Sequence, residues 1–596
     1  MPHTTATFDR RDLVPSHDGD HILPADPLFT RLLALAHRRN PRPAIRDVNA
    51  GVERTAAELL SDVLRLRRVI RANLTRKTLQ DLRQGRQEVY ISIVAPGGYE
   101  FTVGVLAVLA LGAAVSPFSS AQPVTEAVYY ISKARSVAVL ASTTTVSLAE
   151  AASREIQRTV SSSFAFVPIR HMNREPPVEL DKIRISSDRF LDPNSAGVVI
   201  FTSGTTGPPK GAVLSRAAMI DGSLSFAQLM GLEPSDTLLH LLPVHHSTGI
   251  WVSFFPFLLT GACIEFKSGS FDAEWTWKRW LEGGLTHFTG VPTIYMRMMR
   301  WYLEKSSSSS SSVDSGEGGE MTKYKAAAAA LKTCLCGTSA LPKPIADFWT
   351  TLRDGRPIVQ RYGSTESGVV FNMSPYPDET RTTPDGSVGE LTVGVDAKLA
   401  DGNEGEILIK SPHMFSKYIY DSEATAKAHD AQGYFKSGDV ARREGKYYFI
   451  VGRASVDIVK SGGYKISALD VERELMSLPY IAEAMVVGVP DDEFGQRVGA
   501  VVSLRDDDIA REFYNTQKRS PQTLSLDQLR DDVRSRLAGY KMPTLLRVIQ
   551  GELPKGGTGK VIKKTLGPMY FPPNYIEDTE VQVWTNTKRR AGPTKL

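Results

Sequence analysis

The pattern of apolar and polar residues differs between two parts of the chain. Between about residues 28 and 451, amphipathic helical stretches are separated by short uncharged runs such as VYISIVAP (89–96), SVAVLAS (136–142) and AGVVIFT (196–202). Strands alternating with helices are typical of βαβ units and largely parallel sheets. A helix is predicted from Thr55 to Ile70, because Thr55 and Glu58 have capping-box spacing. The pattern predicts a large α/β domain over residues 28–451, preceded by a tail, residues 1–27.

A second pattern of helices and strands begins near Gly452. Helices are predicted at 469–478 and 524–537, and apolar strands at EAMVVGVP (483–490) and GAVVSLRD (499–506). This combination predicts a small α+β domain over residues 452–570. The residues after it, 571–596, are rich in Pro, Lys and Arg and are expected to form a tail.

Two stretches depart from these helix and strand patterns. The longest uncharged run, Phe101 to Phe118, only just reaches membrane-spanning length and contains Gly104, Gly112 and Pro117. We expect a buried helix that runs into a core strand rather than a transmembrane segment. The serine run at 306–312 lies within a low-complexity segment, residues 305–322, that carries too little apolar surface to pack. It is expected to be a disordered insertion in the large domain.

Composition excludes several classes of protein. The net charge of +5, from 71 basic and 66 acidic residues, gives no reason to expect nucleic acid as a partner. Cys263, Cys334 and Cys336 cannot build a disulfide framework, nor do they complete a zinc site. The N-terminus has no apolar core of a signal peptide, so an intracellular, cytoplasmic protein is expected, either a monomer or a homodimer. The C-terminal Thr-Lys-Leu is a loose relative of the peroxisomal address, which keeps that compartment as an alternative.

The segment FTSGTTGPPKG (201–211) is the strongest local signal. An apolar strand leads into glycines, hydroxyl side chains and Lys210. Backbone N–H groups, hydroxyls and a lysine together favour a polyphosphate ligand. The segment is not a Walker A loop, because the Gly-Lys-Ser/Thr triplet is missing. A flexible surface turn is the alternative interpretation.

Two later segments carry groups suited to a nucleotide. In RYGSTE (361–366), Tyr362 could stack on a base and Glu366 could hold Mg²⁺. In YFKSGD (434–439), Asp439 follows a tight turn and could accept both ribose hydroxyls. Near the C-terminus, the glycine-rich segment PKGGTGK (554–560) could carry Lys560 to a distant site, although a solvated basic turn has the same composition.

Taken in order with Gly452-Arg453 and VKSGGYKI (459–466), these segments resemble the acyl- and aryl-CoA synthetase superfamily of adenylate-forming enzymes over roughly residues 30–570. GRASVDIVKSGGYKISALDVE (452–472), LPVHH (242–246), GVPTIY (290–295) and RYGSTE resemble the malonyl-CoA synthetase branch most closely. The resemblance implies a large domain of packed βαβ sheets with a β-barrel-like part, and a small mobile α+β domain. It also implies the use of ATP, Mg²⁺ and coenzyme A.

The resemblance implies a role for each matching residue in nucleotide binding. The β- and γ-phosphates would be held by Thr202, Ser203, Gly204, Thr205, Thr206, Gly207 and Lys210. The adenine, ribose and neighbouring acyl pocket would be lined by Gly337, Thr338, Ser339, Tyr362, Gly363, Asp439 and Arg453. Thr365 would contact the α-phosphate, and Glu366 would bind Mg²⁺.

The resemblance also implies two roles for the small domain. Lys560 would bridge the acid's carboxylate and the α-phosphate, where a cation stabilises the charge that develops as pyrophosphate leaves. After rotation of the domain, coenzyme A would meet the loop formed by Lys460, Gly462, Gly463 and Lys465. Ser455 or Val456 occupies the position of the hinge.

The acid is less well specified by the sequence. Arg361 could pair with a second carboxylate, which favours a small dicarboxylic acid such as malonate, or it could form a salt bridge with a structural Glu. Gly290, Ser364 and His246 are the other expected acid-binding residues, and His246 is also placed in the catalytic set; packing of His245 and His246 in the pocket wall is the alternative. Ser364 and the run His246-Ser-Thr-Gly249 depart from the malonyl-CoA synthetase pattern.

The expected reaction is ATP-dependent formation of an acyl-adenylate and then of an acyl-CoA thioester. A ligase for short, medium or other monocarboxylic acids is one alternative, and an enzyme that loads an acid onto a carrier protein is another. A serine hydrolase is excluded because GTSAL (337–341) lacks the last glycine of a nucleophile elbow.

Overall fold

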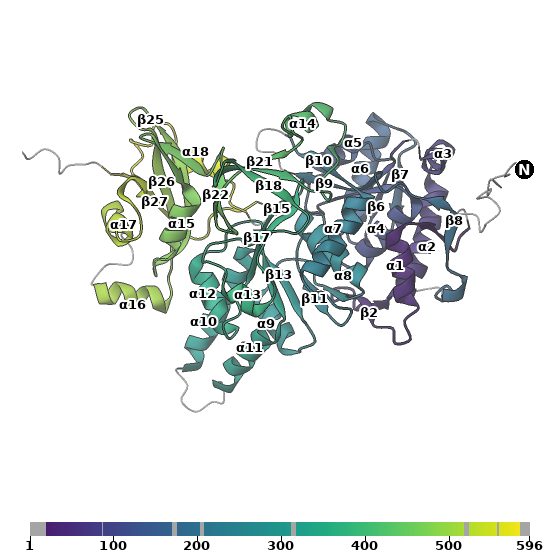
Figure 1. Cartoon of the computed structure of the whole chain (residues 1–596), viewed down its shortest axis with the longest axis horizontal. Helices are drawn as coiled ribbons and strands as arrows, with labels where there is room; N and C mark the ends of the chain where they lie inside the picture. Colours follow the sequence, from purple (N-terminus) through teal and green to yellow (C-terminus); the bar gives the residue numbers. More distant parts are fainter. Residues whose placement is uncertain are drawn as a thin grey trace, which may run out of the picture.

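The computed structural model describes residues 19–85, 87–169, 176–202, 208–310, 318–517, 524–556 and 560–584. Two large sheets, each flanked by helices, build most of the chain, and a smaller unit that contains α15 to α18 lies at one end (Figure 1). This mixed α/β arrangement, with a large N-terminal part and a smaller C-terminal part, is the predicted fold class.

The first large sheet has seven strands, and its central strands are parallel. Their order is β20 (Lys417–Tyr418), β10 (Lys210–Ser215), β9 (Ala196–Thr202), β5 (Ala114–Phe118), β4 (Tyr90–Val94), β6 (Ala138–Ala141) and β7 (Ala165–Pro168). The predicted strands at 89–96, 136–142 and 196–202 are all present. β10 is antiparallel to β9, and Lys210 pairs with Thr202 across the turn that joins them.

The second large sheet has nine strands, of which the six from β15 to β2 run parallel. Their order is β17 (Glu390–Leu391), β16 (Gly368–Asn372), β15 (Val359–Ser364), β14 (Thr333–Cys336), β13 (His287–Gly290), β11 (Thr237–His240), β12 (Cys263–Phe266), β2 (Pro43–Asp47) and β3 (Val52–Thr55).

Helices cover both sheets. They are α1 (Pro27–Ala36), α2 (Ala56–Asn73), α3 (Arg76–Gln84), α4 (Tyr99–Leu111), α5 (Val124–Lys133), α6 (Val146–Thr159), α7 (Arg216–Leu229), α8 (Phe255–Thr260), α9 (Ala273–Leu281), α10 (Pro292–Ser310), α11 (Gly318–Ala330), α12 (Lys343–Leu352), α13 (Pro377–Arg381) and α14 (Ser422–Lys427). A π-helical segment, η3 (Thr248–Phe254), precedes α8.

Two predictions about helices are confirmed. Thr55 caps α2, and the reciprocal capping box with Glu58 is formed. The uncharged run at 101–118 is a helix followed by a core strand: α4 is buried on nearly all sides, Gly112 ends it in a left-handed conformation, and β5 follows. No helix in the described ranges is long and apolar enough to cross a membrane.

The large part of the chain also contains an antiparallel sheet of four strands, which corresponds to the expected β-barrel-like part. This sheet is open over the described residues. Its order is β18 (Asp396–Asp401), β19 (Glu404–Lys410), β21 (Phe435–Glu444) and β22 (Tyr447–Arg453). Asp439 lies inside β21 rather than after a turn, and it pairs across the sheet with Arg453 at the end of β22. The chain then enters the small unit.

The small unit contains a six-stranded sheet and four helices. The strands are β24 (Tyr464–Ser467), β23 (Ile458–Ser461), β26 (Gly495–Leu504), β27 (Leu545–Ile549) and β28 (Val581–Val583), with β25 (Ile481–Asp491) also paired to β26. The helices are α15 (Ala468–Met476), α16 (Asp508–Gln517), α17 (Leu526–Val533) and α18 (Lys563–Tyr570).

Both predicted tails contain residues that belong to the fold. At the N-terminal end, β1 (Ile22–Ala25) pairs with β8 (Arg184–Phe190), and the buried Asp26 forms a salt bridge of 3.1 Å with the buried Arg216. At the C-terminal end, Phe571 is buried and β28 pairs with β27. Long-range pairing of this kind leaves little trace in the local composition, which explains the error. Residues 594–596, the proposed address, lie outside the described residues.

The expected disordered insertion at 305–322 is also corrected in part. α10 continues to Ser310, and α11 begins at Gly318; residues 311–317 lie outside the described residues. The reason is packing at the two ends of the segment. Trp301 of α10 and the buried Tyr324 of α11 meet edge to face, with ring centroids 5.2 Å apart. The helices therefore extend into the low-complexity sequence from both sides.

Candidate active site

A cavity of about 2040 Å³ opens where the carboxyl ends of parallel strands from both large sheets meet the small unit. This edge is where ligands bind in open α/β sheets. The end of β9 and the segments that follow β11, β13, β14 and β15 all contribute to the lining, at Thr202, His246, Thr293, Ser339 and Thr365 respectively. The fold thus brings together residues as distant in the sequence as Thr202 and Thr365.

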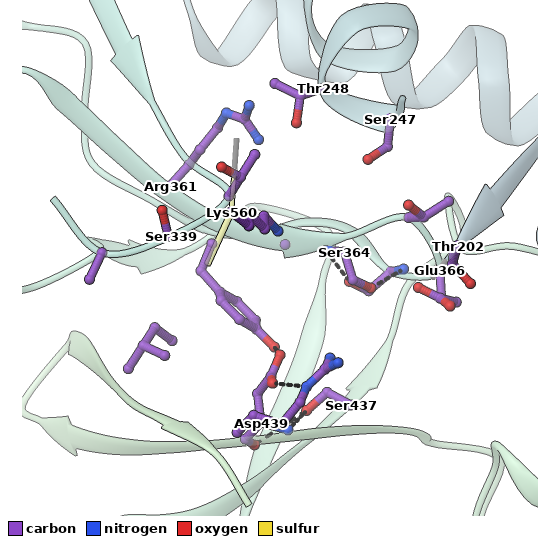
Figure 2. A pocket seen from close by; sticks show the side chains of 18 of the residues that line it. Thr202, Ser247, Thr248, Ser339, Arg361, Ser364, Glu366, Ser437, Asp439 and Lys560 are labelled. Carbon is purple, nitrogen blue, oxygen red and sulfur yellow. Dashed lines mark hydrogen bonds and ion pairs between the residues drawn. The ribbon is translucent and has the colours of Figure 1, made fainter. Parts of the chain in front are cut away.

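One wall of the cavity carries Tyr362, Asp439 and Arg453. The Tyr362 hydroxyl donates to Asp439 Oδ2 at 2.7 Å, and Arg453 Nε donates to Asp439 Oδ1 at 2.8 Å (Figure 2). Burial and then the charge of Asp439 raise the pKa of Tyr362 well above its usual value. The carboxylate thus holds both partners. The three side chains present an aromatic ring, an anion and a cation to one region, which suits the base and ribose of a nucleotide.

A second region contains Thr202, Lys210 and Glu366. Tyr418 contacts both Glu366 and Lys210: its hydroxyl donates to Glu366 Oε1 at 2.9 Å, and Lys210 Nζ lies 5.2 Å from the centre of its ring. Thr202 and Glu366 both line the cavity and are labelled in Figure 2. The rest of the predicted phosphate loop, Ser203, Gly204, Thr205, Thr206 and Gly207, lies outside the described residues. The described ends of the loop, Thr202 and Lys210, both line the cavity.

Glu366 is suited to hold a magnesium ion together with a nucleotide. Only one of its oxygens is bonded to Tyr418, and the side chain lines the cavity. Mg²⁺ is commonly bound by one or two carboxylates plus substrate phosphates. Over the described residues no cluster of three or more His, Cys, Asp or Glu side chains could hold a metal by itself. A metal at Glu366 would therefore depend on phosphate oxygens for its other ligands.

Arg361 is a buried cation for which the described residues provide no salt-bridge partner. The residue is 8% exposed, and neither Nε nor Nη2 has a hydrogen-bond partner among the described residues. Burial lowers its pKa to about 10, so the side chain keeps its charge at neutral pH. Its guanidinium extends toward the part of the cavity where Thr248 lies (Figure 2). Within the described ranges no carboxylate forms a salt bridge with it, which disfavours the structural Glu that the sequence left open.

The strand next to Arg361 leaves room for it. A Cβ at Gly337 would lie 3.2 Å from Arg361 Cζ, so a larger residue there would press on the guanidinium. The following residue, Thr338, has a φ of 73°, and its buried hydroxyl has no described partner. Backbone strain and unsatisfied buried groups of this kind concentrate at functional sites. Gly337 thus approaches Arg361, while Thr338 and Ser339 line the cavity.

The segment after Arg361 is held by a short local network. Ser364 Oγ accepts from the Ser367 N–H at 3.1 Å, and the Ser364 N–H donates to Ser367 Oγ at 3.1 Å. A Cβ on Gly363 would lie 2.0 Å from the carbonyl oxygen of Gly368, so glycine is required where the two strands approach. Gly363, Ser364 and the buried Thr365 all line the cavity.

Lys560 reaches the same cavity from the small unit. Water in the open cavity still reaches its side chain, but protein surrounds it on most sides, and this desolvation, followed by the charge of Arg453, lowers its pKa. The lysine in turn helps to lower the pKa of His246, after the larger effect of burial. Lys560 therefore lies within electrostatic range of Arg453 and His246.

Comparison with known proteins identifies the architecture. Residues 35–419 match the AMP-binding enzyme family, and residues 470–560 match the AMP-binding enzyme C-terminal domain. The chain belongs to the AMP-binding enzyme family. The first match alone covers most of the chain, so the predicted membership of the adenylate-forming acyl-CoA synthetases is confirmed.

Relatives of this AMP-binding enzyme are ligases. It is 31% identical to the acyl-CoA ligase oryP of Aspergillus oryzae, over 92% of this chain and 93% of that one. It is 32% identical to the malonate–CoA ligase of Arabidopsis thaliana, over 80% and 77% of the two chains. The ATP-bound MatB structure from Rhodopseudomonas palustris matches with a TM-score of 0.71 and 25% identity, over 92% of this chain and 99% of that one. These matches support the malonyl-CoA synthetase branch and an AMP-forming acyl-CoA synthetase.

The loop expected to meet coenzyme A does not line the cavity in this arrangement. Gly462 and Gly463 form the left-handed turn between β23 and β24, with φ of 55° and 84°. Lys460 and Lys465 flank the turn with exposed side chains, and the exposed Tyr464 stacks on Tyr540 at 4.3 Å. The AMP-binding enzyme therefore has Lys560 at the cavity while this hairpin faces solvent.

Gly290 is placed differently from the prediction. It ends β13 as a buried residue, and a Cβ on it would lie 2.9 Å from the ring of Tyr295. The lining residue from this segment is Thr293. Because a glycine presents only backbone, its position relative to a pocket depends on how the next helix packs.

Several lining residues had no signal in the sequence of this AMP-binding enzyme. Tyr418 lies more than fifty residues from Glu366 yet is bonded to it. Trp251 and Thr248 project from the π-helical segment η3, a distortion that is frequent at functional sites. The sequence of η3, TGIWVSF, contains no pattern that identifies a π-helix, so only the fold could reveal these contacts.

Two histidines at the cavity of this AMP-binding enzyme, His245 and His246, are neutral at physiological pH. Burial lowers the pKa of His245 and of His246 to about 4. Neither imidazole thus supplies positive charge for an anionic substrate near neutral pH. His246 lines the cavity as a neutral donor or acceptor, which is compatible with either acid contact or packing in the wall.

Two buried histidines away from the cavity predict acid sensitivity. Burial lowers the pKa of His240 and of His287 to about 4. Both would take up a proton near pH 6.5 in the unfolded chain. Between pH 6.5 and 4 the unfolded state therefore binds more protons, and stability falls as the pH falls. We expect His240 to account for a loss of about 2 kcal/mol in unfolding free energy between pH 7 and 5.

Urea unfolding of wild type and of His240→Gln at both pH values measures this effect. The variant should lose about 2 kcal/mol less than wild type on acidification, whatever its stability at pH 7. His37→Gln is the control, because His37 is an exposed residue at the end of α1. An unchanged pH dependence in His240→Gln would contradict the assignment.

Proposed function

We propose that this protein is an ATP-dependent acid–CoA ligase for a small dicarboxylic acid such as malonate. The family membership supports the ligase chemistry, and one observation supports the choice of acid: Arg361 is a buried, charged guanidinium that lines the cavity, and no described residue pairs with its Nε or Nη2. A buried charge is costly unless it is paired. A second carboxylate on the substrate would provide the partner, with the planar fork of arginine binding it through two hydrogen bonds.

In the first half-reaction, an oxygen of the acid's other carboxylate would attack the α-phosphorus of ATP. The bond from that phosphorus to the bridging oxygen breaks, and pyrophosphate leaves. Lys560 would stabilise the negative charge that develops, while Thr202, Lys210 and the loop between them would hold the leaving phosphates. Thr365 would contact the α-phosphate. Mg²⁺ at Glu366 would neutralise phosphate charge.

Nucleotide binding would rest on the wall formed by Tyr362, Asp439 and Arg453. Asp439 is oriented by two hydrogen bonds, which leaves its carboxylate poised to accept from ribose hydroxyls. Tyr362 would stack on adenine beside Gly337, Thr338, Ser339 and Gly363. Holding ATP and the acid in one orientation is a major source of rate enhancement, because the attack becomes effectively intramolecular.

In the second half-reaction, the sulfur of coenzyme A would attack the acyl carbon of the adenylate. A C–S bond forms, the acyl C–O bond to phosphate breaks, AMP leaves, and the thiol proton passes to solvent. We propose that the small unit, residues 452 onward, rotates about the segment that follows Arg453 to withdraw Lys560. Lys460, Gly462, Gly463 and Lys465 would then approach the thiol.

An acid panel tests the proposed substrate class. Pyrophosphate exchange should be fastest with malonate or methylmalonate, and slower by at least about 10-fold with short or medium fatty acids and aryl acids, since those leave Arg361 unpaired. Inert dicarboxylates beside active monocarboxylates would overturn the role of Arg361. Thioester formation with free coenzyme A, compared with a phosphopantetheinyl carrier protein, distinguishes a CoA ligase from a carrier-loading enzyme.

A further inference from the structure

Three charged side chains meet in a buried cluster between the cavity and the core of the small unit. Lys563 Nζ lies 2.6 Å from Asp457 Oδ1 and 2.7 Å from Glu472 Oε1. The side chains of Lys563, Asp457 and Glu472 are 11%, 16% and 10% exposed. We call these three residues the lysine cluster. Such screening from water makes the interactions much stronger than those of surface ion pairs.

The members of the lysine cluster come from three separate segments. Asp457 closes the turn after β22, where its Oδ2 accepts from the Arg453 N–H at 3.0 Å. Glu472 lies on α15 and also accepts from the Val486 N–H at 2.6 Å. Lys563 is the first residue of α18, in the smaller unit of Figure 1, three residues after Lys560. The cluster therefore ties the end of the Lys560 loop to the turn that leaves the large part of the chain.

The described ends of the loop have other attachments. Lys555 and Val561 form an isolated bridge, the Gly556 N–H donates to Lys560 O at 2.9 Å, and Lys555 Nζ lies 2.6 Å from Glu483 Oε1. Between these anchors the sequence is Gly-Gly-Thr-Gly, of which residues 557–559 lie outside the described residues. The position of Lys560 thus depends on what fixes the two ends, and the lysine cluster fixes the second.

The two carboxylates of the lysine cluster keep Lys563 in its charged form. Burial opposes the charged form of Lys563, but the carboxylates of Glu472 and Asp457 outweigh it and raise its pKa. Gly452, with a φ of 134°, lets the turn close tightly, because a Cβ there would lie 2.5 Å from Asp457 Cβ. The turn, α15 and the loop end are consequently held as one assembly.

We propose that Lys563 is a positioning residue for adenylation: by pairing with Asp457 and Glu472, it sets the end of the loop so that Lys560 reaches the cavity. This inference rests on the proposed function of Lys560. Lys563 would act through Lys560, because its own ammonium group is taken up by Asp457 and Glu472 at the edge of the cavity. Its loss should affect the half-reaction that needs Lys560 in the cavity and spare the one in which Lys560 is withdrawn.

The experiment compares Lys563→Met with wild type in the two half-reactions. Acid-dependent pyrophosphate exchange should fall about 10-fold in kcat with little change in the KM for ATP, because a small displacement of a reacting group is costly. Thioester formation from chemically synthesised acyl-adenylate and coenzyme A should stay within about 2-fold of wild type. Lys563→Arg keeps the charge and should restore most of the exchange activity. Glu472→Gln should lower exchange in the same selective way.

Arg534→Met is the matched control. It removes a cation from an ion pair of 2.7 Å with Asp531 in the same unit, but both side chains are well exposed. Both half-reactions should keep their wild-type rates. Unchanged exchange in Lys563→Met would overturn the inference, as would an equal loss in both half-reactions. Absence of exchange in wild type with every acid would instead contradict the proposed function, so the two failures are distinguishable.

Discussion

Replacing Lys560 with alanine is expected to abolish nearly all acid-dependent pyrophosphate exchange while ATP still binds. Lys560 lines the cavity near Arg453 and His246, where its charge can meet the α-phosphate and the acid's carboxylate. Removal of one group that stabilises developing charge typically costs about 100- to 1,000-fold in kcat. ATP affinity should change little, because the triphosphate and nucleoside contacts come from other residues. Exchange kinetics and calorimetric titration with ATP measure the two effects.

Two further measurements make the Lys560 prediction specific. Thioester formation from synthetic acyl-adenylate should survive in Lys560→Ala, because the lysine acts in the first half-reaction only. Lys446→Ala is a control for loss of a lysine, since Lys446 is a surface residue paired with Glu390 at 2.7 Å. Full exchange activity in Lys560→Ala would contradict the assigned role, and with it the proposed adenylation mechanism.

Replacing Arg361 with methionine is expected to remove the preference for dicarboxylic acids. The guanidinium is buried and has no described carboxylate partner, so a substrate carboxylate would be fully desolvated against it. Truncation of one member of a buried charge pair costs about 2 to 5 kcal/mol. For malonate this corresponds to a fall in kcat/KM of about 30- to 4,000-fold. Steady-state kinetics with malonate and with propionate measure the change.

The reference for Arg361→Met is a monocarboxylic acid in the same variant. Turnover of propionate should be retained or should rise, because a neutral side chain no longer demands an anion. Arg361→Lys keeps the charge but loses the planar fork, so its activity with malonate should be intermediate. A parallel loss with both acids would show that Arg361 supports the structure of the pocket rather than selecting the acid.

The large elements of the fold were predictable from local patterns. The strands at 196–202 and 90–94 follow from uninterrupted apolar runs, and α2 follows from the capping box at Thr55 and Glu58. Errors arose where structure depends on distant partners. β1 and β28 form because strands elsewhere in the chain accept them, and α11 is extended toward the serine run because Tyr324 finds Trp301.

The candidate site shows the same division. The cavity is lined by residues that the sequence motifs and the family resemblance name in advance: Thr202, Lys210, Tyr362, Glu366, Asp439, Arg453 and Lys560. Gly290 ends β13 and does not line the cavity, which Thr293 lines instead, and Tyr418 was not anticipated. Both depend on how side chains pack after the strands have assembled.

By itself, the sequence determined which chemical groups this protein has and the order in which they occur, since motifs depend on neighbours only a few residues away. Only the tertiary structure decided which groups are paired. It leaves Arg361 charged and without a described anion, bonds Tyr418 to Glu366, and buries Lys563 between Asp457 and Glu472. Desolvation and charge pairing act over a few ångströms in space between residues up to 106 positions apart in the chain, so no local pattern encodes them.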